Sequence, residues 1–228
     1  MAVAKITLYG PAQAPYTEKV RRALRVKGLE FELREPESPE DYRRWNPKTG
    51  LLPVLEIDGE WIPDSTAILF RLDELFPDPP LLSPDALVAQ QQRQLENWAD
   101  ESFLWYFQRW QRLAGEAQAA DAQAAGGGLS ASLGKRLRDL FAWLPRGGTW
   151  ERPETALLRE LGDRQDDLVR FLGDRPFFFS DRLSMADLAV YGMLYTMRNG
   201  VIPGGAERLA SRPALVELMR RVERETGG

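Results

Sequence analysis

The first 76 residues alternate between strand-like and helix-like patterns, whereas every regular pattern after a proline-rich stretch is helical. This alternation predicts the order strand, helix, strand, helix, strand, strand, helix. A sheet built in that order is mixed and has helices on both faces. Four prolines within residues 77–85 indicate a linker. We therefore expect an α/β domain over residues 1–78, followed by an all-α helical bundle over residues 86–228.

Local signals predict where several elements of the first domain begin. Thr17 is a good N-cap residue, and we expect the first helix to start there. Ser38 is followed by a proline, which predicts a second helix start. The Asp-Gly pair at 58–59 lies between two β-rich runs and predicts a hairpin. The stretch "DSTAILFRLDELFP" predicts a third helix on the pattern of its apolar residues.

The second half of the chain shows amphipathic helical patterns. They cover residues 86–113, 129–144, 154–172, about 184–198, and the closing stretch "RPALVELMRRVERE". The stretch "AGEAQAADAQAAGGG" is of low complexity, and its Gly run predicts a flexible break; we interpret residues 114–150 as an insertion or lid. Ser184 and Asp187 have the spacing of a capping box.

The chain contains no cysteine and no histidine, which restricts its chemistry. Disulfides, thiol nucleophiles, imidazole-based triads and most zinc sites are excluded, and we expect no metal site. The net charge of −4 argues against nucleic acid as a partner. No apolar run approaches the length of a membrane span, and the N-terminus lacks a signal-peptide pattern, so we expect no membrane partner and a cytoplasmic location.

Two short motifs suit a peptide-like ligand. Pro53 begins a strand and can be cis, which would expose the backbone N–H and C=O of Leu52 to an extended peptide. An ordinary proline at the start of a strand is the alternative. Asp64 can accept from an ammonium group, while Ser65 can cap the following helix, whose first N–H groups can bind a carboxylate. The pair thus suits a zwitterionic amino-acid end, and a plain N-cap is the alternative.

Three stretches resemble the cytosolic glutathione transferases: "APYTEKVRRAL", "NPKTGLLPVLEIDGEWIPDSTAILFRLDELFP" and "SDRLSMADLAVYGML". The resemblance covers nearly the whole chain except about residues 114–150. It implies a thioredoxin-like N-terminal domain, an all-α C-terminal domain, glutathione as substrate and a homodimer. By this resemblance Leu52 before Pro53 pairs with the cysteinyl part of glutathione. Asp64 and Ser65 hold the γ-glutamyl amine and carboxylate.

The glycyl carboxylate of such a ligand needs a basic residue. Lys48 is our choice, with Arg43 and Arg44 as alternatives. Position 14 departs from the resemblance, because serine- and cysteine-type relatives carry there the residue that activates or attacks the thiol. Ala14 and the absence of cysteine argue against a cysteine-dependent reductase.

Transferase chemistry then requires that other groups stabilise the thiolate of glutathione. Backbone N–H donors at residues 14–17 and one hydroxyl would together be sufficient. Tyr9 and Thr17 are the first candidates for that catalytic hydroxyl, although core packing and helix capping are their ordinary roles. Gln13 and Tyr106 are further possible donors, whereas Tyr16 resembles the aromatic residue that packs under this loop in the family.

The long helix over 86–113 carries six aromatic residues within 13 positions. Trp98, Tyr106 and Trp110 fit a core stripe, whereas Phe103, Trp105 and Phe107 fall outside it. We interpret the extra aromatics as an apolar co-substrate pocket, with packing against a partner subunit as the alternative. We expect an enzyme that conjugates glutathione to small apolar electrophiles. The alternative is a non-catalytic glutathione- or peptide-binding or regulatory protein on the same fold.

Overall fold

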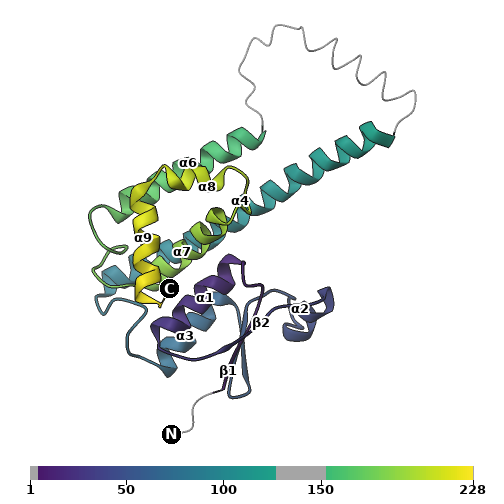
Figure 1. Cartoon of the computed structure of the whole chain (residues 1–228). Helices are drawn as coiled ribbons and strands as arrows, with labels where there is room; N and C mark the ends of the chain where they lie inside the picture. The colour runs from purple at the N-terminus through teal and green to yellow at the C-terminus, as the bar shows by residue number, and fades with distance from the viewer. Residues whose placement is uncertain (1–4, 127–152, 228) are drawn as a thin grey trace. The chain divides into compact units, whose positions relative to one another are not determined.

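The computed structural model describes residues 5–126 and 153–227. Contacts divide the chain into two compact units, Met1–Phe103 together with Arg164–Gly228, and Leu104–Asp163. Two helices, α4 (Ala86–Gly126) and α6 (Pro153–Leu172), each contribute residues to both units (Figure 1). The first unit contains the whole sheet and the C-terminal helices. The proline-rich stretch at 77–85 lies inside it, and the division into domains at 1–78 and 86–228 stays a prediction.

The first unit is built on a four-stranded mixed sheet with the order β2-β1-β3-β4. The strands are β1 (Ile6–Tyr9), β2 (Glu32–Arg34), β3 (Val54–Ile57) and β4 (Glu60–Pro63). β1 pairs with β2 in parallel and with β3 antiparallel, and β3 pairs antiparallel with β4. The hairpin expected at 58–59 is confirmed, since both turn residues have positive φ.

Three helices pack on this sheet: α1 (Pro15–Val26), α2 (Pro39–Trp45) and α3 (Ser65–Leu75). α1 and α3 contact each other on one face, and α2 lies on the other side (Figure 1). Alternate strand residues such as Leu8 and Leu55 are fully buried, as are Leu24 and Leu69 of the helices. This arrangement confirms the expected thioredoxin-like fold.

The start of α1 differs from the prediction. Ala14 is the N-cap and Pro15 occupies the first helical position, so Thr17 lies inside the first turn. The N-cap assignment of Thr17 was wrong because proline at the first position already has a helical φ and needs no N–H partner. The helix therefore starts at Pro15 without a side-chain cap.

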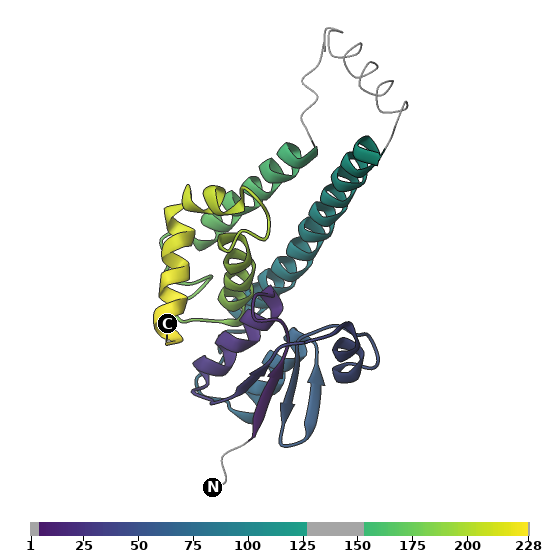
Figure 2. The same cartoon turned by 45° about the vertical axis from the view of Figure 1, so that its right-hand side comes forward.

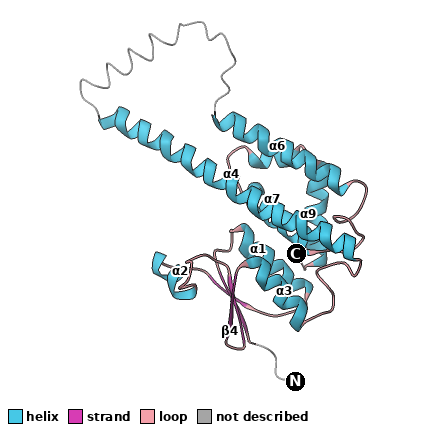
Figure 3. Ribbon diagram, turned by 180° about the vertical axis from the view of Figure 1, so that it is seen from behind, coloured by secondary structure: helices cyan, strands magenta, loops and turns pink. Residues whose placement is uncertain are grey.

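The segments after α3 are helices joined by loops (Figure 3). Besides α4 and α6 they include α7 (Met185–Arg198), α8 (Gly205–Ala210) and α9 (Pro213–Glu225). The capping box of Ser184 and Asp187 at the start of α7 is confirmed. The helix predicted over 86–113 is longer than expected, because α4 continues through the alanine-rich stretch to Gly126, and alanine is the strongest helix former. The remaining glycines of the Gly run lie outside the described residues. The helix predicted over 129–144 lies outside the described residues.

The most extensive helix packing in the first unit is between α1 and α7, which run side by side in Figure 2. The buried Arg22 of α1 donates to the hydroxyl of Tyr191 at 3.0 Å and to that of Thr226 at 2.6 Å. Tyr191 in turn donates to Glu223 at 2.9 Å. These bonds connect α1 to α7 and to α9. No helix within the described ranges is long and apolar enough to cross a membrane.

Candidate ligand-binding site

Strand register brings three of the predicted segments to one end of the sheet. Tyr9 at the end of β1 pairs with Val54 at the start of β3, and Val54 pairs with Pro63 at the end of β4. The loop 10–14 follows Tyr9, and Asp64 follows Pro63. Leu52–Pro53 leads directly into Val54. The end of β1, the start of β3 and the end of β4 are thus neighbours.

The Leu52–Pro53 peptide is cis, as predicted. The Leu52 side chain is half-buried and packs against the cluster formed by Tyr9, Trp45 and Val54. The amide of Asn46 donates to the carbonyl of the preceding Leu51 at 2.8 Å and fixes the loop before the strand. Packing of its side chain therefore holds Leu52 against the end of the sheet.

Asp64 has an unusual backbone conformation, with φ of 76° and ψ of 126°. It is the N-cap of α3, since its carboxylate accepts from the N–H of Ala67 at 3.0 Å. The prediction that Ser65 caps this helix was wrong, because Ser65 is already the first helical residue. A positive φ in a non-glycine residue is strained, and such strain clusters at functional sites. Asp64 is exposed, whereas Ser65 is buried directly beside it.

A buried ionic cluster lies beneath Ser65. The ammonium of Lys19, on α1, forms ion pairs with Glu96 and with Asp100, the latter at 2.7 Å, and both acids are on α4. Lys19 also donates to the hydroxyl of Ser65 at 3.2 Å. Because an ammonium has no acceptor, the Ser65 oxygen accepts this bond and its own proton stays available for a ligand. The Thr66 hydroxyl donates to Glu96 at 2.5 Å and completes the cluster.

Burial is the main cause that raises the pKa of Asp100 to about 6. The neighbouring carboxylates of Glu96 and Asp64 raise this pKa further, while Lys19 opposes the shift. Two carboxylates, Glu96 and Asp100, face the single ammonium of Lys19, and this acidic excess favours an additional cation nearby.

Sequence analysis did not identify Lys19, Glu96 or Asp100. Lys19 is separated from Glu96 by 77 positions and from Asp100 by 81, so no local motif contains them. The only signal is that Glu96 and Asp100 are four positions apart, and hence on one face of α4.

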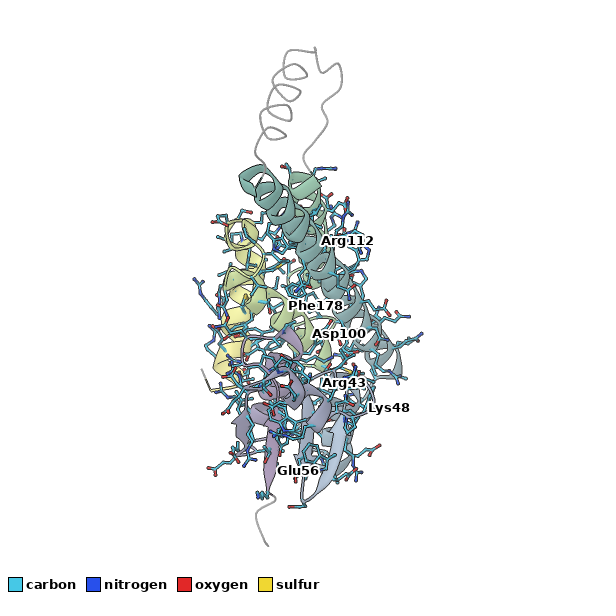
Figure 4. The ribbon with its side chains drawn as sticks, turned by 90° about the vertical axis from the view of Figure 1, so that its right-hand side faces the viewer. Arg43, Lys48, Glu56, Asp100, Arg112 and Phe178 are labelled. Carbon is cyan, nitrogen blue, oxygen red and sulfur yellow. The ribbon has the colours of Figure 1, made fainter. Side chains whose placement is uncertain are left out.

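Tyr9 makes contacts that favour a packing role. Its hydroxyl donates to Glu56 at 2.7 Å, and its ring lies 4.9 Å from the rings of both Trp45 and Trp61. Figure 4 labels Glu56 on the sheet. Burial is the first cause that raises the pKa of Tyr9 above its ordinary value, and the Glu56 carboxylate acts in the same direction. Because the hydroxyl proton of Tyr9 is already bonded to Glu56, this residue is poorly placed to donate a hydrogen bond to a thiolate.

The other two hydroxyl residues of this region are Thr17, which is buried, and Tyr16, which is half-buried. Thr17 is fully buried, and its hydroxyl has no hydrogen-bond partner among the described residues. It lies against Gly10, where a Cβ atom would come within 2.4 Å of the threonine oxygen. The Tyr16 hydroxyl donates to the backbone carbonyl of Asp100 at 2.8 Å, and burial raises its pKa.

The loop before α1 presents backbone donors. The N–H of Ala12 bonds Glu35 at 2.8 Å, and that of Ala14 bonds the carbonyl of Pro11 at 3.0 Å. Pro15 has no N–H group, so the first turn offers those of Tyr16 and Thr17. Donors at this position lack helical partners, and the helix dipole favours an anion beside them.

The three basic candidates for a ligand carboxylate differ in their surroundings. Lys48 and Arg43 are exposed, on the loop after α2 and on α2 respectively (Figure 4). Arg44 already pairs with Asp41 at 2.7 Å. Lys48 and Arg43 are therefore better placed than Arg44 to meet a new anion.

Two aromatic residues of the second unit, Tyr106 and Trp105, follow the predicted division, whereas Phe107 and Trp110 are both half-buried. The Tyr106 side chain is buried, whereas that of Trp105 is 48% exposed. Their rings meet edge to face at 4.8 Å, and the guanidinium of Arg109 lies 4.9 Å from the Trp105 ring. Trp105 is an apolar surface available to a ligand or a partner.

Comparison with known proteins gives a consistent family. The model of the glutathione S-transferase N-terminal domain matches residues 8–80, and that of the C-terminal domain matches residues 153–227. Glutathione S-transferase Z2 of Arabidopsis thaliana is 39% identical over 89 residues, which are 36% of this chain and 39% of that protein. The chain thus spans well under half of the length of this relative. A probable glutathione S-transferase, GSTU1 of Oryza sativa subsp. japonica, is 29% identical over 185 residues, covering 78% of this chain and 67% of that protein.

Solved structures agree with the sequence relatives. A glutathione S-transferase from Methylobacterium radiotolerans, solved in complex with glutathione sulfonate, superposes with a TM-score of 0.62. It is 29% identical and the match covers 96% of this chain and 90% of that one. Both family models, the sequence relatives and this fold agree, and the chain belongs to the glutathione transferase family.

Proposed function

We propose that this protein binds glutathione at the end of the sheet and conjugates it to small apolar electrophiles. The observation that carries the proposal is the register that aligns Tyr9, Val54 and Pro63, because it gathers the loop before α1, Leu52 and Asp64. Relatives named as glutathione transferases, one solved with glutathione sulfonate, support the same ligand.

Each part of glutathione has a proposed partner. The Leu52 backbone, before Pro53, pairs with the cysteinyl residue. Asp64 accepts from the γ-glutamyl ammonium, and the available proton of the Ser65 hydroxyl bonds the γ-glutamyl carboxylate. Lys48 meets the glycyl carboxylate. The acidic excess around Asp100 supports the ammonium position.

The reaction requires the thiolate. The thiol loses its proton to solvent, the sulfur attacks the electrophilic carbon and forms a C–S bond, and the leaving group departs with the bonding electrons. Lowering a thiol pKa by two units needs about 2.7 kcal/mol. A helix N-terminus contributes up to roughly 1–2 kcal/mol and a charge-assisted hydrogen bond about 1.5–3. The N–H groups of Tyr16 and Thr17 are therefore sufficient in magnitude.

Calorimetry with reduced glutathione tests binding, and thiolate absorbance against pH tests activation. We expect binding at millimolar ligand and a lowered thiol pKa in the complex. Tyr9 and Thr17 remain the two proposed catalytic hydroxyls, and the Tyr9→Phe and Thr17→Val variants test them. Unchanged turnover in either variant removes that residue from the proposal. Absence of binding to the wild-type protein contradicts the function as a whole.

Ala14 favours a second candidate function, a non-catalytic glutathione- or peptide-binding protein. The two functions differ in one measurement, since a binder leaves the thiol pKa of bound glutathione at its solution value. A lowered pKa together with turnover of an aryl halide rejects the binder. An unshifted pKa rejects the transferase.

The exposed Trp105 supports the binding of an apolar co-substrate beside α4. Quenching of tryptophan fluorescence by that substrate tests this proposal.

We also propose a homodimer. The first unit carries a cavity of about 350 Å³ partly lined by Trp98 and Phe171, and the Phe171 side chain is 45% exposed. Sedimentation should show a dimer that the Phe171→Glu variant dissociates. The Trp61→Glu variant, at an equal 45% exposure, is the control and should stay dimeric.

A further inference from the structure

α7 contacts the polypeptide on both sides of Ala14. The first contact is at Gly192, where a Cβ atom would lie 2.3 Å from the carbonyl oxygen of Pro15 and 3.1 Å from its carbon. Cβ atoms do not approach other atoms this closely in proteins. The α7 backbone therefore lies directly against the first residue of α1, and only glycine permits this distance.

The second contact is one helical turn further along α7. The Thr196 side chain is buried, and its hydroxyl lies 3.4 Å from the carbonyl oxygen of Gln13 and 3.0 Å from that of Gly192. A hydroxyl has one proton, and both neighbours are acceptors. Thr196 thus places a single donor between α7 and the residue immediately before Ala14.

We propose that Gly192 and Thr196 are positioning residues for the turn that holds the glutathione thiolate. They fix the chain at residues 13 and 15, and therefore set the direction of the Tyr16 and Thr17 N–H groups. The inference rests on the proposed function. Without a hydroxyl or thiol side chain at position 14, stabilisation depends on backbone donors, whose effect requires placement within about 0.5 Å.

The first test needs no ligand. Hydrogen exchange of the amides at residues 12–17 is compared between the wild-type protein and the Thr196→Val and Thr196→Ser variants. Valine keeps the shape of threonine and removes the hydroxyl, whereas serine keeps the hydroxyl. We expect exchange about tenfold faster in the valine variant and wild-type rates in the serine variant, with unchanged rates in β3. Equal rates at residues 12–17 in all three proteins would overturn the inference.

The Gly192→Ala variant tests the first contact, between Gly192 and Pro15, by the same exchange measurement, with Gly205→Ala as a matched control. A Cβ atom at Gly205 would lie 3.6 Å from that of Met197, which is ordinary contact. We expect faster exchange at residues 12–17 only for the Gly192 variant. If that variant does not fold, the threonine pair still decides the question.

The thiol pKa of bound glutathione supplies a readout that a purely structural role would not change. We expect the Thr196→Val variant to raise this pKa by about one unit, a tenfold loss of thiolate, with a fall in kcat larger than any change in KM. The serine variant should restore both values. If the wild-type protein binds no glutathione, the proposed function fails while the exchange experiment still decides the positioning role.

Discussion

The Asp187 carboxylate holds the start of α7 in place. One oxygen accepts from the N–H of Phe178 at 2.8 Å, and the other accepts from the N–H and the hydroxyl of Ser184 at 2.9 and 2.7 Å. The residue is fully buried. Its replacement by alanine leaves two buried backbone N–H groups without partners.

The size of the effect follows from these bonds. Each unpaired buried N–H group costs about 1–3 kcal/mol, and the lost cap costs about 1 more. The higher helix propensity of alanine returns up to about 0.7 kcal/mol. We therefore expect the Asp187→Ala substitution to lower the free energy of unfolding by about 2–6 kcal/mol. For a chain of this size the melting temperature falls by about 4–24 °C.

Urea unfolding followed by circular dichroism at pH 7 measures this change. The Asp187→Asn variant keeps an acceptor oxygen and should lose less than the alanine variant. An alanine variant within about 1 kcal/mol of the wild-type protein would refute the reasoning.

The same residue predicts a pH dependence. Burial raises the pKa of Asp187 to about 7, although its hydrogen bonds act in the opposite direction. Because this pKa is higher in the folded state than in the unfolded state, the folded state binds the proton more tightly. The stability gained in this way is fully present below about pH 4 and is lost as the pH rises through about 7. The asparagine variant should therefore gain stability relative to the wild-type protein between pH 4 and 7, and a constant difference would contradict the assignment.

Three further predictions follow from buried charges and from position 14. The buried ammonium of Lys27 donates to Asp73 at 2.5 Å. Lys27→Met should therefore lower the free energy of unfolding in urea by about 2–4 kcal/mol, a figure already reduced because the Asp73 side chain is 21% exposed. An unchanged unfolding midpoint would argue against a stabilising pair. Burial raises the pKa of Asp100 to about 6, so its stabilising contribution is lost as the pH rises from about 4 through 6. Asp100→Asn should then be progressively more stable relative to the wild-type protein from pH 4 to 7 in the same assay, and parallel pH curves would reject this. Ala14→Ser should add a hydrogen bond to the thiolate and raise kcat by about 10–100-fold with an aryl halide, whereas an unchanged kcat would mean that the thiolate lies elsewhere.

Local signals in the sequence predicted local structure well. The capping box at Ser184 and the hairpin at 58–59 are both encoded within a few neighbouring residues. The start of α1 was misplaced for the same kind of reason, because Thr17 and Pro15 are competing local signals and the proline prevails. The helix predicted to end at residue 113 continues to Gly126, because the alanine-rich stretch that follows has a high helix propensity.

The parts of the site that could not be predicted are made by distant segments. Lys19 meets Asp100 across 81 positions, and Thr196 meets Gln13 across 183. The contacts of Tyr9 depend on strand register, which a single sequence does not specify. The sequence pointed to Asp64 and Ser65, but the helix cap is Asp64 rather than Ser65, because the Asp64 carboxylate accepts from the N–H of Ala67.

The bond between Arg22 and Thr226 spans 204 positions, and it has a consequence for synthesis. Ribosomes extend a chain by about 5–20 residues per second, so Thr226 is added roughly 10–40 s after Arg22. During that time α1 can pack on the sheet, while its opposite face has neither α7 nor α9. A nascent chain that pauses before residue 185 exposes that face next to Ala14, where a chaperone can bind it. Although α1 is made before α7 and α9, its packing is therefore completed only after both of them.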